Sequence, residues 1–178
     1  MNLYVIRHGR TDDNDRGIFN GRYDEDINEK GIEQAKKASE EVAKLNIDLI
    51  ICSPLLRTRH TMELVNVNNV PVIYDELLVE RDYGELTGKS VRLTEGHDMW
   101  DYNKNVDFEG LEQAKDIINR GKRCLDNIKN KYPDRNILIV THNGMARALY
   151  VYFNGIPEDG NLYNCGRHDN CEIRKYEW

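Results

Sequence analysis

Two apolar segments lie far apart in the chain and end in the same way. Residues 3–6 and 137–140 carry no polar alternation, which is the pattern of strands buried on both faces of a parallel sheet. The first run leads into Arg7-His8-Gly9 and the second into Thr141-His142-Asn143-Gly144. Because ligands of open α/β sheets gather at the carboxyl ends of strands, we expect the two histidines to share one pocket.

The pattern between these segments alternates strand and helix. Apolar residues at helical spacing predict helices over residues 29–45, 111–132 and 145–153, and Asn28 is suited to cap the first of them. Short apolar runs predict strands at 48–52 and 70–73, and the alternation over 171–176 indicates a closing edge strand. Residues 12–26 are polar and indicate a long loop. This order predicts a three-layer α/β/α sandwich with a mostly parallel sheet.

A further helix is predicted from Ser53 to about Val65, with Ser53 as its cap and Pro54 in its first turn. Arg57 then lies at the helix N-terminus, where free N–H groups and the helix dipole already favour an anion. A guanidinium at this place suits bidentate binding of phosphate. The alternative is a solvated arginine on a helix face, and that description fits Arg59 better.

Glu80 follows the apolar residues 77–79 directly, where a solvated carboxylate is not the obvious choice. A carboxylic acid that is withdrawn from water can hold a proton near neutrality and act as an acid. The alternative is an ordinary glutamate at a strand end, paired with Arg81. The segment by itself supports the two interpretations equally.

Residues 89–108 form the least regular part of the chain and contain Trp100 and Tyr102. We expect this segment to be a short cap that covers the mouth of the pocket and selects the substrate. Its aromatic residues are equally compatible with a small satellite core. We find no internal repeat or linker, so residues 1–178 are expected to form a single domain that buries about 70% of its unfolded surface.

Composition excludes several classes of protein. Charged residues make up 31% of the 178 residues and the net charge is −6, which disfavours nonspecific binding of nucleic acid. No apolar run approaches the roughly 20 residues of a membrane span, and charged residues interrupt the opening segment too early for a signal peptide. We therefore expect a cytoplasmic protein without a membrane or nucleic-acid partner. An acidic chain can still hold a locally positive pocket.

The four cysteines do not require disulfides, which fits a reducing compartment. Cys52 ends an apolar run and is expected to be a small buried side chain, and Cys124 lies in a predicted helix. Cys165, His168 and Cys171 lie close together in sequence, so a zinc site is conceivable. A fourth ligand and paired C-x-x-C spacing are missing. We therefore expect a loop that leads into the last strand, and no metal.

At this point the residues match a known family. The chain resembles the histidine phosphatase superfamily, in the branch that includes cofactor-dependent phosphoglycerate mutases and many small phosphatases. The match covers nearly the whole chain and rests on motifs that occur in the same order. They are Arg7-His8-Gly9-x-Thr11-x-x-Asn14, Asn20-Gly21, Ile27-Asn28-Glu29-x-Gly31-x-x-Gln34-Ala35, Ser53-Pro54-Leu55-x-Arg57-x-x-x-Thr61, Glu80-x-x-Tyr83-Gly84-x-x-x-Gly88 and Val140-Thr141-His142-x-Gly144.

The resemblance implies a role for each matched position. His8 is implied to be the nucleophile that takes the phosphoryl group, and Glu80 the proton donor. Arg7, Arg57 and His142 are implied to form the positive cage around the phosphate. The implied contacts to phosphate or substrate further include Asn14, Asn20, Gly21 and Asn143.

The chain departs from the family pattern at two positions beside the site. Arg10 stands where many relatives carry Glu, and it either adds positive charge near the phosphate or faces solvent. Asn143 stands where many relatives carry Gly, which is compatible if the main-chain N–H of this residue is the group that binds. Neither departure affects the core residues. We therefore expect Arg10 and Asn143 to influence the choice of substrate and not the activity itself.

The expected activity is a metal-independent phosphatase that acts on a small phosphorylated metabolite and needs no cofactor, because arginines supply the positive charge. The alternatives are a phosphoglycerate mutase-type transferase and a phospho-ligand binding protein without turnover. A mutase needs a closed pocket that excludes water, and the cap expected here is modest. The presence of His8, Glu80 and His142 argues against the binding protein. The sequence specifies neither the substrate nor the oligomeric state.

Overall fold

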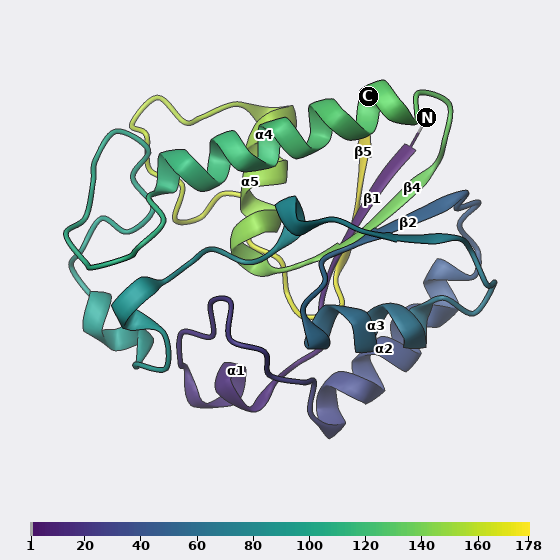
Figure 1. Ribbon diagram of the computed structural model, residues 1–178, viewed down its shortest axis with the longest axis horizontal. Helices are drawn as coiled ribbons and strands as arrows, with labels where there is room; N and C mark the ends of the chain where they lie inside the picture. The colour runs from purple at the N-terminus through teal and green to yellow at the C-terminus, as the bar shows by residue number, and fades with distance from the viewer. Residues whose placement is uncertain (1) are drawn as a thin grey trace.

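The computed structural model describes residues 2–178, which form a sheet of five strands flanked by helices (Figure 1). The strands lie in the order β3-β2-β4-β1-β5. The neighbours β1 and β4, β4 and β2, and β2 and β3 are parallel, whereas β5 is antiparallel to β1 at the sheet edge. The mostly parallel sheet and the closing edge strand are thereby confirmed. The strand bounds are β1 Asn2–Arg7, β2 Leu49–Cys52, β3 Val72–Tyr74, β4 Ile137–Thr141 and β5 Ile173–Glu177.

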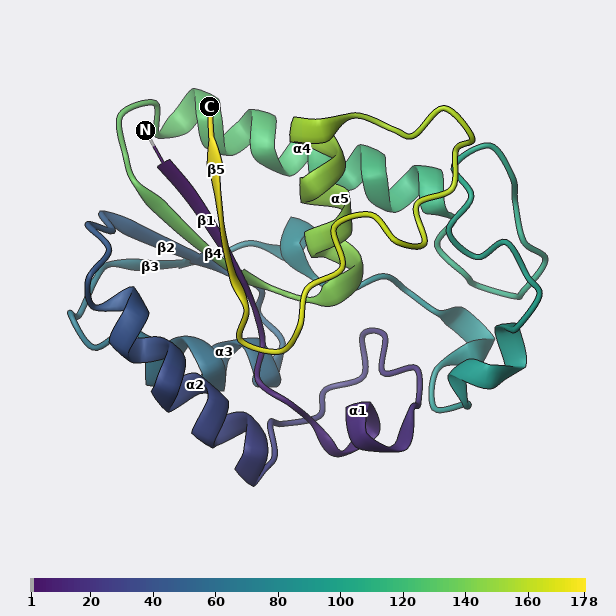
Figure 2. The ribbon, with the colours of Figure 1, turned by 180° about the vertical axis from the view of Figure 1, so that it is seen from behind.

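Helices cover both faces of the sheet, as the three-layer prediction requires. One layer holds α2 (Glu29–Val42) and α3 (Leu56–Val65), and the opposite layer holds α4 (Ala114–Lys131) and α5 (Asn143–Asn154) (Figures 1 and 2). Successive side chains of a strand point to opposite faces, so an unbroken apolar run serves both layers. In β4, Ile137 and Ile139 pack in the core beneath α4 and α5, and Leu138 and Val140 pack in the core beneath α2 and α3.

The segment predicted as a long loop contains a short helix, α1 (Asp12–Arg16). Thr11 accepts a hydrogen bond from the N–H of Asn14, and Gly17 ends the helix in the left-handed conformation. This turn depends on capping groups rather than on an apolar stripe, so hydrophobic periodicity could not reveal it.

The predicted helix over 111–132 starts three residues too early. Residues 111–113 lie outside α4 because the Gln113 side chain bonds the backbone of Val106 and Leu111, which ties this stretch to the preceding loop. Three short 3₁₀ helices within the described chain, η1 (Glu76–Leu78), η2 (Gly84–Leu86) and η3 (Val91–Thr94), were not predicted.

The start of α3 also differs from the prediction. Ser53 and Pro54 precede the helix, whose first residue is Leu56, and Leu55 occupies the cap position without a side-chain bond. Asp24, from the loop before α2, accepts the N–H of Leu56 at 2.6 Å. A residue far along the chain therefore supplies the cap that Ser53 was expected to give, and Ser53 is left free for another contact.

Two further features frame the site. Leu86, Met99 and Leu111 form a small separate core, with Trp100 and Phe108 of segment 89–108 packed against it. This confirms the satellite core without excluding a role of the segment over the pocket. Within residues 2–178 no helix combines the length and the apolar character that crossing a membrane would need.

Candidate active site

Adjacent strand ends bring the two histidines together. Arg7, the last residue of β1, lies opposite Thr141, the last residue of β4, and His8 N–H donates to the Thr141 carbonyl at 2.9 Å. His8 and His142 therefore leave the sheet side by side, with ring centroids 5.2 Å apart. The two rings are adjacent at the carboxyl edge of the sheet, as predicted, but His8 alone of the two lines the cavity described below, so the prediction of one shared pocket is confirmed only in part.

The surroundings of His8 leave one ring nitrogen free. Nδ1 lies 2.7 Å from the carbonyl oxygen of Gly9, and because a carbonyl only accepts, Nδ1 must carry the hydrogen. Burial, with the positive charges of Arg57 and Arg7, holds the pKa of His8 well below 6.5. The imidazole is therefore neutral at pH 7, and its lone pair is on Nε2.

The ring of His142 is held by Ser53, which the sequence predicted to be a helix cap. Its Nε2 lies 2.8 Å from Ser53 Oγ, while the buried Nδ1 has no partner within the described chain. Burial, Arg57 and His8 hold the pKa of His142 well below 6.5, so the free protein carries a neutral ring here and not the cation that a charge cage suggested. Since Ser53 binds Nε2, Nδ1 is the ring nitrogen that is left without a partner in the described chain.

Arg7 and Arg57 are fixed by neutral oxygens. Arg7 donates to the carbonyl of His168 at 2.9 Å and to Asn14 Oδ1 at 3.4 Å. Arg57, only 1% exposed, donates to the carbonyls of Tyr23 and Gly21 at 2.7 Å each. Nε of each arginine is buried without a partner in the described residues. Both guanidiniums are thus oriented without a carboxylate that would neutralise them, and the solvated alternative for Arg57 is wrong.

Glu80 is 7% exposed and lies against the N-terminus of α5. Its carboxyl oxygens accept the N–H groups of Gly144 at 3.1 Å, Met145 at 3.2 Å and Arg81 at 2.8 Å. These bonds fix the carboxyl group in the wall of the cavity that also contains His8. An ion pair with the Arg81 side chain, the alternative drawn from the sequence, does not form among the described residues, because Arg81 donates to the carbonyls of Glu112 and Met99.

A cavity of about 680 Å³ opens at this edge of the sheet. Its volume falls within the roughly 300–1,000 Å³ of small-molecule sites. His142 is fully buried and does not reach its surface. The predicted residues that line it are Arg7, His8, Asn14, Asn20, Gly21, Arg57, Glu80 and Asn143.

The three asparagines expected to contact phosphate or substrate also form hydrogen bonds within the protein. Asn14 Oδ1 accepts from Arg7 and from Asn170 Nδ2, so its own amide N–H groups remain available. Asn20 donates to Glu25, and its buried Oδ1 has no partner in residues 2–178. The Asn143 side chain accepts the N–H of His168 at 3.1 Å, so this side chain has a structural task besides any main-chain contact.

Arg10 lies on the cavity wall, but its charge is already paired. Its Nε donates to Asp15, and its side chain is 38% exposed. Of the two alternatives from the sequence, partial exposure to solvent describes it better than an added charge on the phosphate.

Several residues that line the cavity were not predicted as site residues, and two of them bear on the argument. Arg147, on α5, and Asn170, in the loop before β5, both line the cavity. Asn170 donates to the carbonyl of His8 at 3.0 Å. Arg147 follows His142 by five residues on a helix, a spacing that could have been noticed, whereas no local signal marks Asn170.

The cysteine-rich segment forms no metal centre in the part of the chain described here. Cys165, His168 and Cys171 do not belong to any group of three potential ligands in residues 2–178. His168 Nδ1 lies 3.0 Å from the Gly166 carbonyl, and burial lowers the pKa of His168 to about 4. The segment instead positions β1, because its backbone binds Arg7 through the His168 carbonyl and through the Cys171 N–H.

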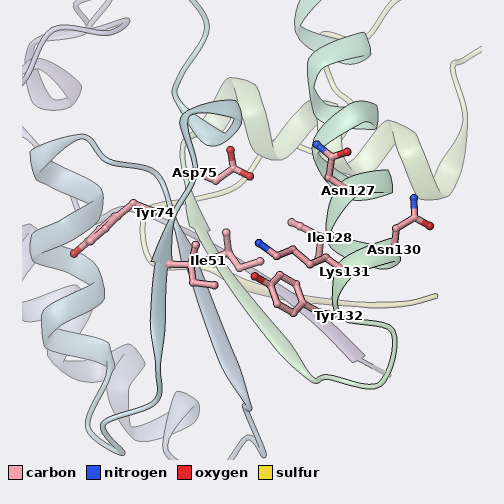
Figure 3. Close-up of a pocket in the computed structure, with 9 residues that line it drawn as sticks. Ile51, Tyr74, Asp75, Asn127, Ile128, Asn130, Lys131 and Tyr132 are labelled. Atoms are coloured by element: carbon pink, nitrogen blue, oxygen red, sulfur yellow. The ribbon is translucent and has the colours of Figure 1, made fainter.

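Another cavity, of about 580 Å³, lies between β2, β3 and the end of α4 (Figure 3). Lys131 and Tyr132 extend there toward Ile51 on β2. None of the predicted site residues lines it. The predicted chemistry therefore belongs to the cavity at the strand ends.

The chain is similar in sequence and fold to known proteins. The family model described as histidine phosphatase superfamily (branch 1) matches residues 3–178. A probable phosphatase of Schizosaccharomyces pombe is 43% identical over 158 residues, which cover 86% of this chain and 73% of the relative. A 2,3-bisphosphoglycerate-dependent phosphoglycerate mutase of Beijerinckia indica is 29% identical, with 88% and 83% covered. The solved α-ribazole phosphatase of Shigella flexneri superposes with a TM-score of 0.83 at 26% identity, with 98% and 89% covered.

Proposed function

The chain belongs to the histidine phosphatase superfamily, and from this premise we propose that it hydrolyses a phosphomonoester of a small metabolite through a phosphohistidine on His8. The observation that carries the proposal is the state of His8. It is neutral, its Nδ1 hydrogen is fixed by the Gly9 carbonyl, and its ring lies beside two guanidiniums without carboxylate partners. A nucleophile with a free lone pair thus faces a site suited to a dianion.

In the first half-reaction, Nε2 of His8 attacks phosphorus and the bond from phosphorus to the ester oxygen breaks. Glu80 donates its proton to the departing oxygen. Arg7 and Arg57 bind the nonbridging oxygens, and His142 lies beside His8, with ring centroids 5.2 Å apart. Positioning and charge stabilisation of this kind are the main requirement of phosphoryl transfer.

In the second half-reaction, water attacks the phosphorus of the phosphohistidine. Glu80 accepts the proton of the water, the bond between phosphorus and Nε2 breaks, and inorganic phosphate leaves. One carboxyl group serves both steps because each step restores the form that the other needs. Hydrogen bonds from the N-terminus of α5 hold the carboxyl group at the cavity wall and fix its position for both steps.

A mutase-type transferase is the second candidate, because the Beijerinckia indica relative carries that name. Segment 89–108 lines part of the cavity through Val91, Thr94, Glu95, His97 and Trp100. We propose that this segment is a cap. Its small size favours access of water to the phosphohistidine and hence hydrolysis over return of the phosphoryl group.

Turnover of phenyl phosphate tests the proposal. We expect hydrolysis by the wild type that is lost in His8→Ala and kept in His60→Ala, which removes a histidine that does not line the cavity. Rapid quenching should trap an acid-labile phosphoryl group on His8. EDTA should leave the rate unchanged, because arginines supply the positive charge. Full activity of His8→Ala, or an adduct on another side chain, would overturn the assignment.

A further inference from the structure

Arg147 is a buried cation without a hydrogen-bond partner on the wall of the same cavity. It is 3% exposed and lies four residues after Asn143, about 6 Å further along the axis of α5. Its Nε and Nη1 atoms are buried and unpartnered, and no ion pair reaches its guanidinium from the described residues. Leaving such donors unpaired costs free energy, so the arrangement indicates that something else binds there.

The protein holds the Arg147 guanidinium in place without neutralising it. Its carbon lies 4.1 Å from the ring centroid of Trp100, which belongs to segment 89–108. A cation over an aromatic ring is attracted to it, but the ring accepts no conventional hydrogen bond. Burial lowers the pKa of Arg147 to about 10, so the side chain is still charged at neutral pH.

Arg7, Arg57 and Arg147 line the cavity, and within the described chain no carboxylate is bonded to any of the three guanidiniums. Overall charge does not set them apart, because Asp13, Glu95 and Asp169 also line the cavity. A phosphomonoester that binds to Arg7 and Arg57 leaves the buried Arg147 guanidinium without a bonded anion.

Arg147 lies apart from the two arginines beside the histidines. Arg57 and Arg7 are the arginines that most lower the pKa of both His8 and His142, apart from the effect of burial, and Arg147 is not among the groups that most affect either. Its guanidinium instead lies over the ring of Trp100. A single ligand that reaches both places must therefore carry its second anionic group at some distance from its phosphate.

We propose that Arg147 binds a carboxylate of the substrate, so that the preferred substrates are phosphomonoesters that also carry a carboxylate. This inference rests on the proposed phosphatase function. It specifies the class of substrate, which the sequence analysis left open. The carboxylate would lie beneath segment 89–108, because Trp100 of that segment covers the Arg147 side chain.

Binding of two matched phosphonates tests the inference without requiring turnover. 3-Phosphonopropionate carries a carboxylate where propylphosphonate carries a methyl group, and neither has an ester bond to hydrolyse. In the wild type we expect the carboxylate to tighten binding, measured by calorimetry, by about tenfold or more. In Arg147→Gln the ratio of the two dissociation constants should fall to within about threefold of one. Equal affinities in the wild type would overturn the proposal.

Arg167→Gln is the matched control, because it removes an exposed arginine at the mouth of the same cavity. We expect this variant to keep most of the preference for the carboxylate. An equal loss in both variants would mean that the overall charge of the cavity, and not contact with Arg147, selects the ligand, and the proposal would fail. Arg147→Lys serves if the Gln variant does not fold, and it should lose part of the preference.

Turnover separates this inference from the function on which it rests. The same comparison can be made with 3-phosphoglycerate and glycerol 3-phosphate, which differ by a carboxylate in place of a hydroxymethyl group. Hydrolysis of both at similar kcat/KM would refute the role of Arg147 and leave the phosphatase intact. A preference for the carboxylated phosphonate without any turnover would support Arg147 and refute the phosphatase.

Discussion

The reactive form of His8 depends on the hydrogen bond from its Nδ1 to the carbonyl oxygen of Gly9. This bond fixes which nitrogen attacks, and the nearby Arg57 and Arg7 keep the ring neutral by lowering its pKa. The same arginines bind the phosphate in the proposed mechanism. Each arginine therefore has two effects, because its positive charge disfavours a protonated imidazole and favours a bound anion.

At the same scale, Glu80→Gln tests the proton donor. We expect turnover of an alkyl phosphate to fall by roughly 10²-fold or more, because the departing alkoxide then lacks an acid. The loss with p-nitrophenyl phosphate should be smaller, since nitrophenolate leaves without a proton. Steady-state rates with the two substrates measure the difference. Glu85→Gln, an exposed glutamate, is the control, and equal rates for wild type and Glu80→Gln with both substrates would refute the role.

At the scale of elements, the turn after β1 is packed backbone to backbone on the start of α2. A Cβ atom added to Gly31 would lie 2.3 Å from the carbonyl oxygen of Arg10, and one added to Gly9 would lie 2.6 Å from that of Gly31. Asn28 N–H donates to the Arg10 carbonyl at 2.8 Å. The helix thereby fixes the chain that leaves His8, which explains the two glycines physically.

We therefore expect Gly31→Ala to destabilise the protein by about 1–3 kcal/mol, because backbone atoms must move to admit the methyl group. Gly→Ala within a helix usually stabilises a protein by about 1 kcal/mol. A destabilised Gly31→Ala variant would therefore indicate the close backbone packing. Urea unfolding measures the stability, and kcat with phenyl phosphate should fall as the turn beside His8 shifts. Lys37→Ala, at an exposed position of α2, is the control. A Gly31→Ala variant as stable as the wild type would contradict this packing.

At the scale of the whole molecule, folding buries imidazoles in neutral form. His168 is fully buried and its pKa falls to about 4, while burial and nearby charges also lower the pKa of His8 and of His142. Below pH 6.5 the unfolded chain binds protons that the folded chain does not. The buried neutral histidines therefore do not reduce the free energy of unfolding above about pH 6.5. The free energy of unfolding falls as the pH drops from there toward 4.

We expect the free energy of unfolding to fall between pH 7 and pH 5, with His168 alone accounting for about 2 kcal/mol. Urea unfolding at pH 7, 6 and 5 measures this change. His168→Gln should make the decline shallower, whereas His97→Gln, an exposed position, should leave the slope as it is. A stability that does not change over this range would show that the buried rings are protonated in the folded protein.

The sequence by itself determined the layers, the strand ends and the residues at those ends. Unbroken apolar runs identify strands with helices on both faces, and a polar residue directly after such a run must lie at the sheet edge. Arg7 and His8 were found in this way, and His142 lies directly beside His8. Glu80 lines the same cavity, but the apolar residues before it lie in and just after the 3₁₀ helix η1 and not in a strand. The catalytic roles of these residues came from the family resemblance and are still to be tested.

Only the tertiary structure decided the partners, because they come from distant parts of the chain. Ser53 was expected to cap a helix but bonds His142, 89 residues away, and Asp24 caps that helix in its place. Arg147 follows His142 by five residues, but that its guanidinium lacks a partner within residues 2–178 is visible only when everything around it is placed. Local pattern fixes the element on which a side chain lies, whereas packing of distant segments fixes what that side chain touches.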